Sequence, residues 1–253
     1  MKKVLLRAPL LSKSGYGVHC RQVFRYLLNK KDIDLKVQIL SWGITPWYLK
    51  EEDLGGLVGE IIKKSDVPPG YKFDVTVQVQ LPNEWDPSLG KFNVGITAGV
   101  ETDTANPVWP NTYCQNMDMV IVPSQHSKNS LLKKSSTSTP VHVVPESYYD
   151  EVIDDPSEIL DLKLKSDFNF LTVGVLTGMT PETDRKNLMY QIKWFVENFR
   201  GNSDVGLVIK TNRGRETSID RRGTTMMLRR LLREINYDGT PNIYFLHGSM
   251  SNE

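Results

Sequence analysis

Two adjacent cations, Arg185 and Lys186, occupy the position in this chain that points most directly to chemistry. An apolar run over 169–175 predicts a buried strand, and a loop rich in Thr, Gly and Pro follows it. Apolar residues then recur at the spacing of one helical face, which predicts a helix over about 184–199. A helix N-terminus is electropositive because its first N–H groups lack partners. Two cations placed there predict an anion site, with phosphate as the expected anion.

Three further candidates follow expected strands. Lys210 ends the expected strand Val205–Lys210, where ligand-binding residues of parallel sheets lie, although a surface lysine is the alternative. Gly15 and Gly17 belong to a loop after the first expected strand, Val4–Ala8. Glycines there let the backbone approach a diphosphate or an acceptor, but an ordinary strand-to-helix turn explains them equally well.

Composition indicates an ordinary globular protein. The 253 residues are 39% hydrophobic and 24% charged, enough for one large or two small domains. The net charge of +1 argues against a nucleic-acid partner. The segment 185–233 nevertheless holds 12 Lys/Arg and 4 Asp/Glu. This segment is either a solvated basic face or a surface for an anionic ligand.

Cysteine and histidine usage suggests neither disulfides nor a metal. Cys20 and Cys114 are the only cysteines, and the four histidines lack the spacing of metal ligands. A reduced, cytoplasmic protein without a metal or cofactor is the expectation. The N-terminal segment does not resemble a signal peptide, and no apolar run approaches the ~18 residues of a membrane span. Peripheral membrane contact stays open.

Strand and helix patterns alternate along the chain, which predicts an α/β protein with mainly parallel sheets. The segment 151–167 is acidic, contains Pro156 and lacks a strong apolar run, so it is interpreted as a linker. The expected domains are therefore 1–150 and 168–253. The last expected helix covers about Thr225–Ile235, where leucines form a stripe.

The order of short motifs resembles the retaining nucleotide-sugar glycosyltransferases of the GT-B fold, the family 4-like or group 1 enzymes. The motifs that carry this resemblance, in chain order, are SGYG (14–17), ETDTANPVW (101–109), DMVIVPS (118–124), VHVVPESYY (141–149), RKN (185–187), LVIKT (207–211) and NIYFLHG (242–248). The resemblance implies two Rossmann-like domains, the first for the acceptor and the second for a nucleotide sugar. It also implies sugar transfer with retention to a glycan, lipid-linked or small-molecule acceptor, without a metal.

The resemblance assigns roles to individual residues. Glu101 matches the family's Glu-Thr position and is the catalytic candidate, which would bind acceptor hydroxyls or assist proton transfer; a helix-capping carboxylate is the alternative. Gly248 would approach the nucleotide base, or simply form a turn. The donor phosphates would lie against Arg185 and Lys186, with Lys210, Gly15 and Gly17 as further contacts.

The sequence departs from the family pattern in two places. The family places an arginine several residues before the lysine; here Met179 or Thr180 falls there, and Arg185 is the expected substitute. The chain ends at Glu253, before the acidic pair that normally holds the donor, so an incomplete second domain is expected. We therefore expect self-association, or a second chain, through about Gly206–Glu253. The alternative function is a non-enzymatic, glycosyltransferase-like structural or sugar-binding protein.

Overall fold

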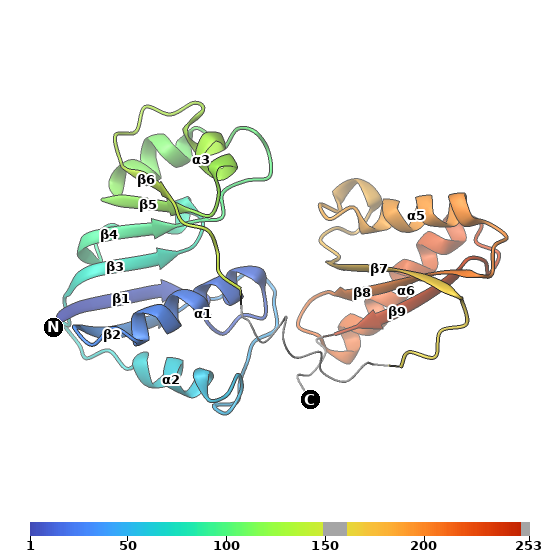
Figure 1. The fold of residues 1–253 in the computed structure, drawn as a ribbon, viewed down its shortest axis with the longest axis horizontal. Helices are drawn as coiled ribbons and strands as arrows, with labels where there is room; N and C mark the ends of the chain where they lie inside the picture. The colour runs from blue at the N-terminus through green and yellow to red at the C-terminus, as the bar shows by residue number, and fades with distance from the viewer. Residues whose placement is uncertain (149–160, 249–253) are drawn as a thin grey trace. The chain divides into compact units, whose positions relative to one another are not determined.

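The chain divides into two compact units, Met1–Asp155 and Pro156–Glu253, in the computed structural model (Figure 1). The structure describes residues 1–148 and 161–248. Each unit is a parallel β-sheet with covering helices, so the predicted α/β class is confirmed. The expected linker 151–167 lies largely outside the described residues, and the domain limits drawn beside it stay predictions.

The first unit is a six-stranded sheet in the order β2-β1-β3-β4-β5-β6, with every neighbouring pair parallel. Its β1 and the helix α1 pack through residues that are fully buried, such as Leu6 and Phe24. Burying one such side chain contributes about 1.5–3 kcal/mol. The elements are β1 (Lys2–Ala8), α1 (Gly15–Leu28), β2 (Ile33–Ile39), α2 (Leu57–Lys64), β3 (Phe73–Val79), β4 (Gly90–Ile96), β5 (Met119–Val122), α3 (Gln125–Leu132) and β6 (Val141–Val143), with short helical turns at Pro82–Glu84, Trp109–Tyr113 and Cys114–Asn116.

The second unit is a three-stranded parallel sheet in the order β7-β8-β9. Its core joins Leu207 and Ile209 of β8 to buried residues of both helices, including Ile192 and Leu228. Because Leu207 and Ile209 point to the same side of β8, both helices cover one face of the sheet. The elements are β7 (Phe168–Val175), a short helical turn (Pro181–Thr183), α5 (Leu188–Phe199), β8 (Val205–Asn212), α6 (Ser218–Glu234) and β9 (Asn242–His247).

Helices α6 and α2 differ from the sequence-based prediction. The predicted start of α6 at Thr225 is wrong by seven residues, because a capping box of Thr217 and Asp220 begins the helix at Ser218. The leucine stripe used for the prediction marks only the buried half of the helix. The short α2 was not predicted, because its eight residues bury only Leu57, Val58 and Ile61, which is too few to establish a period.

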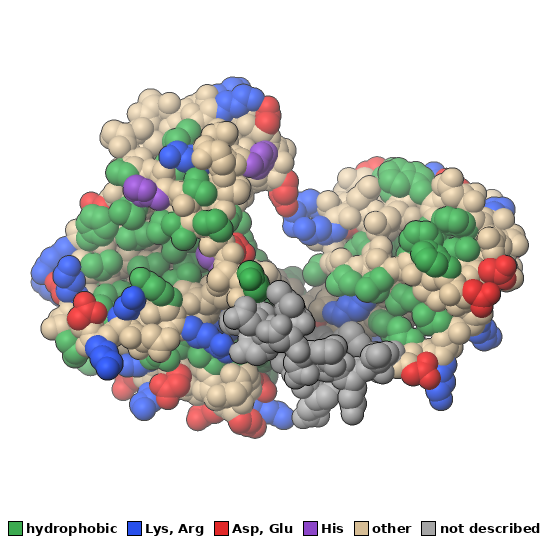
Figure 2. All heavy atoms as spheres, viewed as in Figure 1, with side chains coloured by type: hydrophobic (Ala, Val, Ile, Leu, Met, Phe, Trp, Pro, Cys, Tyr) green, Lys and Arg blue, Asp and Glu red, His purple; other side chains and the backbone are tan. Residues whose placement is uncertain are grey.

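The edge strand β7 exposes a row of large apolar side chains. Leu171 and Val173 are 67% and 68% exposed, and the strand FNFLTVGV contains neither a charge nor a proline. Natural edge strands usually carry a charged residue or a proline, which prevents pairing with other chains. Hydrophobic side chains reach the surface of this unit in Figure 2. The apolar strand lies before Gly206–Glu253, the range expected to mediate association, and no observation tests that expectation.

We predict that the free chain self-associates through β7 rather than through residues 206–253. Replacing Leu171 and Val173 together by lysine should weaken association at least tenfold, because two charges would be buried in the contact. Light scattering over a concentration series measures the change. The double variant Val18→Lys, Tyr26→Lys adds the same charge at exposed apolar positions of the first unit and serves as the control. A parent chain that stays monomeric at high concentration would contradict the prediction.

Candidate functional site

The first unit offers a ligand site where its strand order reverses. The chain passes from β1 outward to β2 and then to β3 on the other side of β1. In open parallel sheets, ligands bind outside the carboxyl ends of the strands at such a reversal. The loop 9–14 after β1 and the residues that follow β3 and β4 therefore form the expected floor of a site.

Hydrogen bonds fix the loop between β1 and α1 in one conformation. Ser14 caps α1 by accepting the N–H of Gly17 at 3.1 Å. The buried guanidinium of Arg21 donates to the carbonyls of Leu10 and Ser12 at 2.9 and 2.8 Å. A Cβ on Gly17 would lie 1.9 Å from the Ser12 carbonyl oxygen, whereas a Cβ on Gly15 would meet nothing within 4 Å. Gly17 is therefore required by the fold, and the space beside Gly15 is open.

Aromatic rings and hydroxyl groups surround this loop. The rings of Tyr16 and Trp42 stack with centroids 3.9 Å apart. The Tyr16 hydroxyl accepts the N–H of Ala98 at 3.0 Å, just beyond β4, and burial raises the pKa of this phenol. The Ser12 hydroxyl lies 2.8 Å from the hydroxyls of both Ser14 and Thr45. The sequence predicted the glycines of this loop and missed Tyr16 and Trp42.

Glu101 follows β4 in the first unit. It is exposed, in an irregular segment after β4. The backbone before it is held by Ser127, whose hydroxyl donates to the Ala98 carbonyl at 2.8 Å. Its catalytic role stays a prediction.

In the second unit, a carboxylate occupies the place where the sequence predicted an anion site. The predicted start of α5 at about 184 is wrong, because Asn187 adopts a left-handed conformation (φ 58°) and the helix begins at Leu188. The buried Asp184 accepts the N–H of Met189 at 3.3 Å and the hydroxyl of Thr177 at 2.9 Å. The positive end of α5 is thus matched by an internal anion. Arg185 and Lys186 are exposed in the turn before the helix.

The loop after β8 has the same construction. The Asp220 carboxylate accepts the backbone N–H groups of Arg215 and Thr217 at 3.0 and 3.1 Å, and the Thr217 hydroxyl at 2.7 Å. These hydrogen bonds, led by that of the Thr217 hydroxyl, lower the pKa of Asp220. Gly214 (φ 67°) lets the loop close, since a Cβ there would lie 2.2 Å from the carboxylate.

One contact joins the two loops. Nη2 of Arg213 contacts the sulfur of Met179. A guanidinium from the loop after β8 therefore reaches the loop after β7, which also carries Arg185 and Lys186. The sequence did not predict a role for Arg213, because the spacing of residues within each loop does not indicate that the two loops are in contact.

Lys210 and Gly248 complete the set of predicted contacts. The predicted end of β8 at Lys210 is wrong by two residues, since the strand continues to Asn212. The Lys210 ammonium donates to the Asn212 side chain at 3.2 Å. Gly248 has φ 106° and its N–H lies 3.4 Å from the Thr211 carbonyl oxygen, so a turn requires the glycine. The phosphate and base roles of these residues stay predictions.

His247 precedes this turn and was not singled out as a candidate. Its Nε2 is buried without a hydrogen-bond partner in the described part of the chain. Burial lowers the pKa of the imidazole, although Asp220 and Glu216 oppose the shift. A neutral imidazole at the carboxyl end of β9 can donate or accept one hydrogen bond to a ligand.

The described residues show no cluster of three or more His, Cys, Asp or Glu side chains able to hold a metal. Cys20 and Cys114 are buried free thiols, and burial raises the pKa of Cys114 to about 12. Over residues 1–148 and 161–248, no helix has both the length and the apolar character needed to cross a membrane.

Comparisons with known proteins bear on the fold. No protein-family model and no curated protein sequence matches the chain. Solved structures do match it over almost its whole length. Trehalose-6-phosphate synthase OtsA is 11% identical with a TM-score of 0.55, covering 100% of this chain and 75% of OtsA. S. aureus MnaA, in a co-structure with UDP, is 11% identical with a TM-score of 0.51, covering 98% of this chain and 70% of MnaA.

A trehalose-6-phosphate synthase studied with bisubstrate glycomimetics, in work on glycosyl transfer with retention, is 10% identical with a TM-score of 0.51 and is covered over 74% of its chain. The chain has the GT-B fold. At identities this low the likeness shows the fold alone. The predicted fold of two Rossmann-like units is confirmed.

Gly17→Ala should destabilise the protein by roughly 1–3 kcal/mol, because the new methyl group collides with the Ser12 carbonyl. Gly15→Ala, two residues earlier in the same helix, should be neutral or stabilise by up to about 1 kcal/mol. Urea unfolding of both variants measures the difference. Equal effects would show that the close approach at Gly17 is absent.

Asp220→Asn should lower stability at neutral pH by removing the carboxylate that holds the loop after β8. Because folding depresses the pKa of this group, its contribution is present above the ordinary value of about 3.9 and disappears as the pH falls through the folded pKa. The parent and the variant should therefore differ in urea midpoint at pH 7 and converge below about pH 4. Asp32→Asn removes the same charge from an exposed residue and should leave the midpoint unchanged at both pH values. A difference between Asp220→Asn and the parent that persists at low pH would contradict this account.

Proposed function

We propose that the protein transfers a sugar, with retention, from a nucleotide-sugar donor to a glycan, lipid-linked or small-molecule acceptor. The observation that carries this proposal is the joining of two cationic loops, by the Arg213–Met179 contact, at the carboxyl ends of β7 and β8 in a GT-B fold. A diphosphate is the ligand that such a group of cations fits.

Arg213 supplies the guanidinium that the sequence pattern lacks. The glycosyltransferases that the sequence resembles carry an arginine where Met179 or Thr180 stands here. Because the Arg213 guanidinium contacts Met179, it lies where the arginine of those enzymes would be, although it comes from the neighbouring loop after β8. Arg213 is therefore the stronger candidate for this role than Arg185, the substitute expected from the sequence.

The first unit supports the acceptor side of the proposal. Stacked rings of Tyr16 and Trp42 offer an apolar face to the C–H groups of a sugar, and the hydroxyls of Ser12, Ser14 and Thr45 exchange hydrogen bonds with its hydroxyl groups. Glu101 remains the proposed catalytic carboxylate of this side.

In the proposed reaction the bond between the anomeric carbon and the donor diphosphate breaks as the acceptor oxygen bonds to that carbon, and the proton of the acceptor hydroxyl passes to the Glu101 carboxylate. Negative charge then develops on the leaving diphosphate. Lys186, Arg185 and Arg213 would neutralise it, with Lys210 as a further cation. No metal is required for this role.

Two observations favour a non-enzymatic, sugar-binding or structural protein instead. The positive ends of α5 and α6 already face the internal carboxylates of Asp184 and Asp220, which disfavours a phosphate at either end. Among the described strands of the second unit the order also runs in one direction, without the reversal at which ligands bind.

A thermal-shift screen of UDP-, GDP- and ADP-sugars tests donor binding, because a ligand stabilises the folded protein by an amount that grows with the logarithm of its excess over Kd. Lys186→Ala and Arg213→Ala should each weaken the best ligand roughly 10- to 100-fold, the effect of losing one charge-assisted hydrogen bond. Lys193→Ala and Arg230→Ala are the matched controls, since each removes an exposed cation already paired to a glutamate four residues on.

Release of free nucleoside diphosphate in the presence of an acceptor panel separates the two functions. Release that depends on Glu101 supports the enzyme. Binding without release supports the sugar-binding alternative, and no binding of any nucleotide sugar overturns the proposed donor site.

A further inference from the structure

The outer face of α6 alternates apolar and basic side chains. Ile219 and Met226 are 80% and 62% exposed, and both exposed fractions are high for large apolar side chains. Exposed arginines share their side of the helix. The α6 stripe comprises Ile219, Arg222, Met226, Arg229 and Arg233, which lie three or four residues apart and hence on one face.

The positive charge of this stripe is not neutralised within α6. The helix contains five arginines and two acidic residues. Asp220 is engaged in the cap at Thr217, and Glu234 binds Arg230 at 2.8 Å. Within residues 1–148 and 161–248, the three arginines of the stripe form no ion pair.

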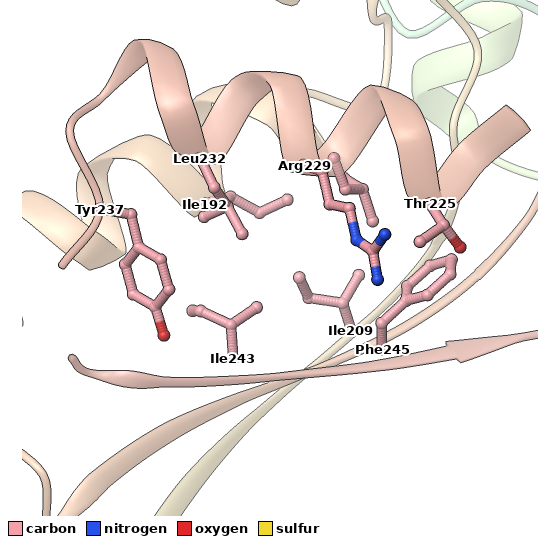
Figure 3. Close-up of a pocket in the computed structure, with 9 residues that line it drawn as sticks. Ile192, Ile209, Thr225, Arg229, Leu232, Tyr237, Ile243 and Phe245 are labelled. Carbon is pink, nitrogen blue, oxygen red and sulfur yellow. The ribbon is translucent and has the colours of Figure 1, made fainter. Parts of the chain in front are cut away.

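A cavity opens beneath the stripe, between α6 and β9. Its volume is about 240 Å³, and most of its lining is apolar, with Ile209, Ile243 and Phe245 on the strands (Figure 3). Two uncharged polar residues also line the cavity. The Thr225 hydroxyl donates a hydrogen bond to the Arg221 carbonyl, and the Tyr237 hydroxyl donates one to the Pro241 carbonyl. The cavity thus suits an apolar group.

Arg229 connects the cavity to the stripe. Its side chain extends from α6 toward the strands, where Ile209 and Phe245 also line the cavity (Figure 3). A second hollow, about 410 Å³ and lined by Met226, Arg229, Leu232 and Arg233, shares Arg229 and Leu232 with the first. Apolar space and guanidinium groups are therefore continuous from the cavity to the outer surface.

We propose that the α6 stripe binds an anionic lipid surface. The three arginines contact headgroup phosphates, Ile219 and Met226 enter the interface, and part of an acyl chain occupies the cavity beside Arg229. A purely acidic protein surface would match the charge but leave the exposed apolar residues and the cavity without a complement. This inference does not depend on the proposed glycosyl transfer.

Vesicle co-sedimentation of the full chain tests the proposal. Binding is expected to vesicles of phosphatidylcholine with 30% phosphatidylglycerol, to fall at high salt, and to be absent with phosphatidylcholine alone. The triple variant Arg222→Gln, Arg229→Gln, Arg233→Gln should lower partitioning on the order of a hundredfold, since glutamine keeps the helix propensity and only the charge is lost. The matched control removes three exposed lysines of the first unit, as Lys31→Gln, Lys50→Gln, Lys63→Gln.

Two further experiments distinguish the contribution of the acyl chain from that of the phosphate group. Thr225→Phe fills the cavity without changing the charge, and it should weaken binding to the acidic vesicles several-fold if an acyl chain enters. Inorganic phosphate at the same ionic strength as a chloride control should not compete, because it lacks the apolar part. Binding that is equal for neutral vesicles, or an equal loss in the lysine control, would overturn the proposal, as would no binding at all.

Discussion

Every described strand pair in both sheets is parallel, and this constraint determines where the loops that carry the candidate site residues lie. Parallel strands must be joined by crossovers, so each carboxyl end is followed by a loop that leads away from the same sheet edge. The polar loop after β1 therefore lies at this edge of the first sheet, and the cationic loops after β7 and β8 lie at the corresponding edge of the second. The same constraint buries helical faces against the sheets and leaves polar chemistry to the loops.

Within the second unit, carboxylates decide the shape of those loops. Asp184 ties Thr177 to the first turn of α5, and Asp220 ties Arg215 and Thr217 to the first turn of α6. Each carboxylate satisfies N–H groups that would otherwise face solvent, and each matches the positive end of its helix. The positive ends of α5 and α6 are therefore less favourable places for a phosphate.

The sequence predicted the strands well because buried parallel strands are short apolar runs bounded by turn residues, as Met119–Val122 shows. Helix starts were predicted less well. The left-handed conformation of Asn187 delays α5, and nothing in the local pattern reveals it. The polar first half of α6 has no apolar period, yet its capping box at Thr217 and Asp220 was a readable signal that the leucine stripe obscured.

Contacts between loops could not be predicted from the sequence. Residues 179 and 213 are separated by a helix and a strand, and only the parallel register of β7 and β8 brings their loops together. The pairing of Tyr16 with Trp42 depends in the same way on β1 and β2 being neighbours. Spacing along one segment describes a helix or strand, whereas a site is made by segments that the sheet order brings together.

These features shape how the second unit can hold an anion. Because the helix N-termini are matched internally, affinity would come from flexible side-chain cations on the loops, namely those of Arg185, Lys186 and Arg213. Such cations lose conformational entropy on binding and are screened by salt, whereas fixed backbone donors need no such ordering. A nucleotide held in this way should bind with a strong dependence on ionic strength, and its specificity would have to come from the base and the sugar rather than from the phosphates.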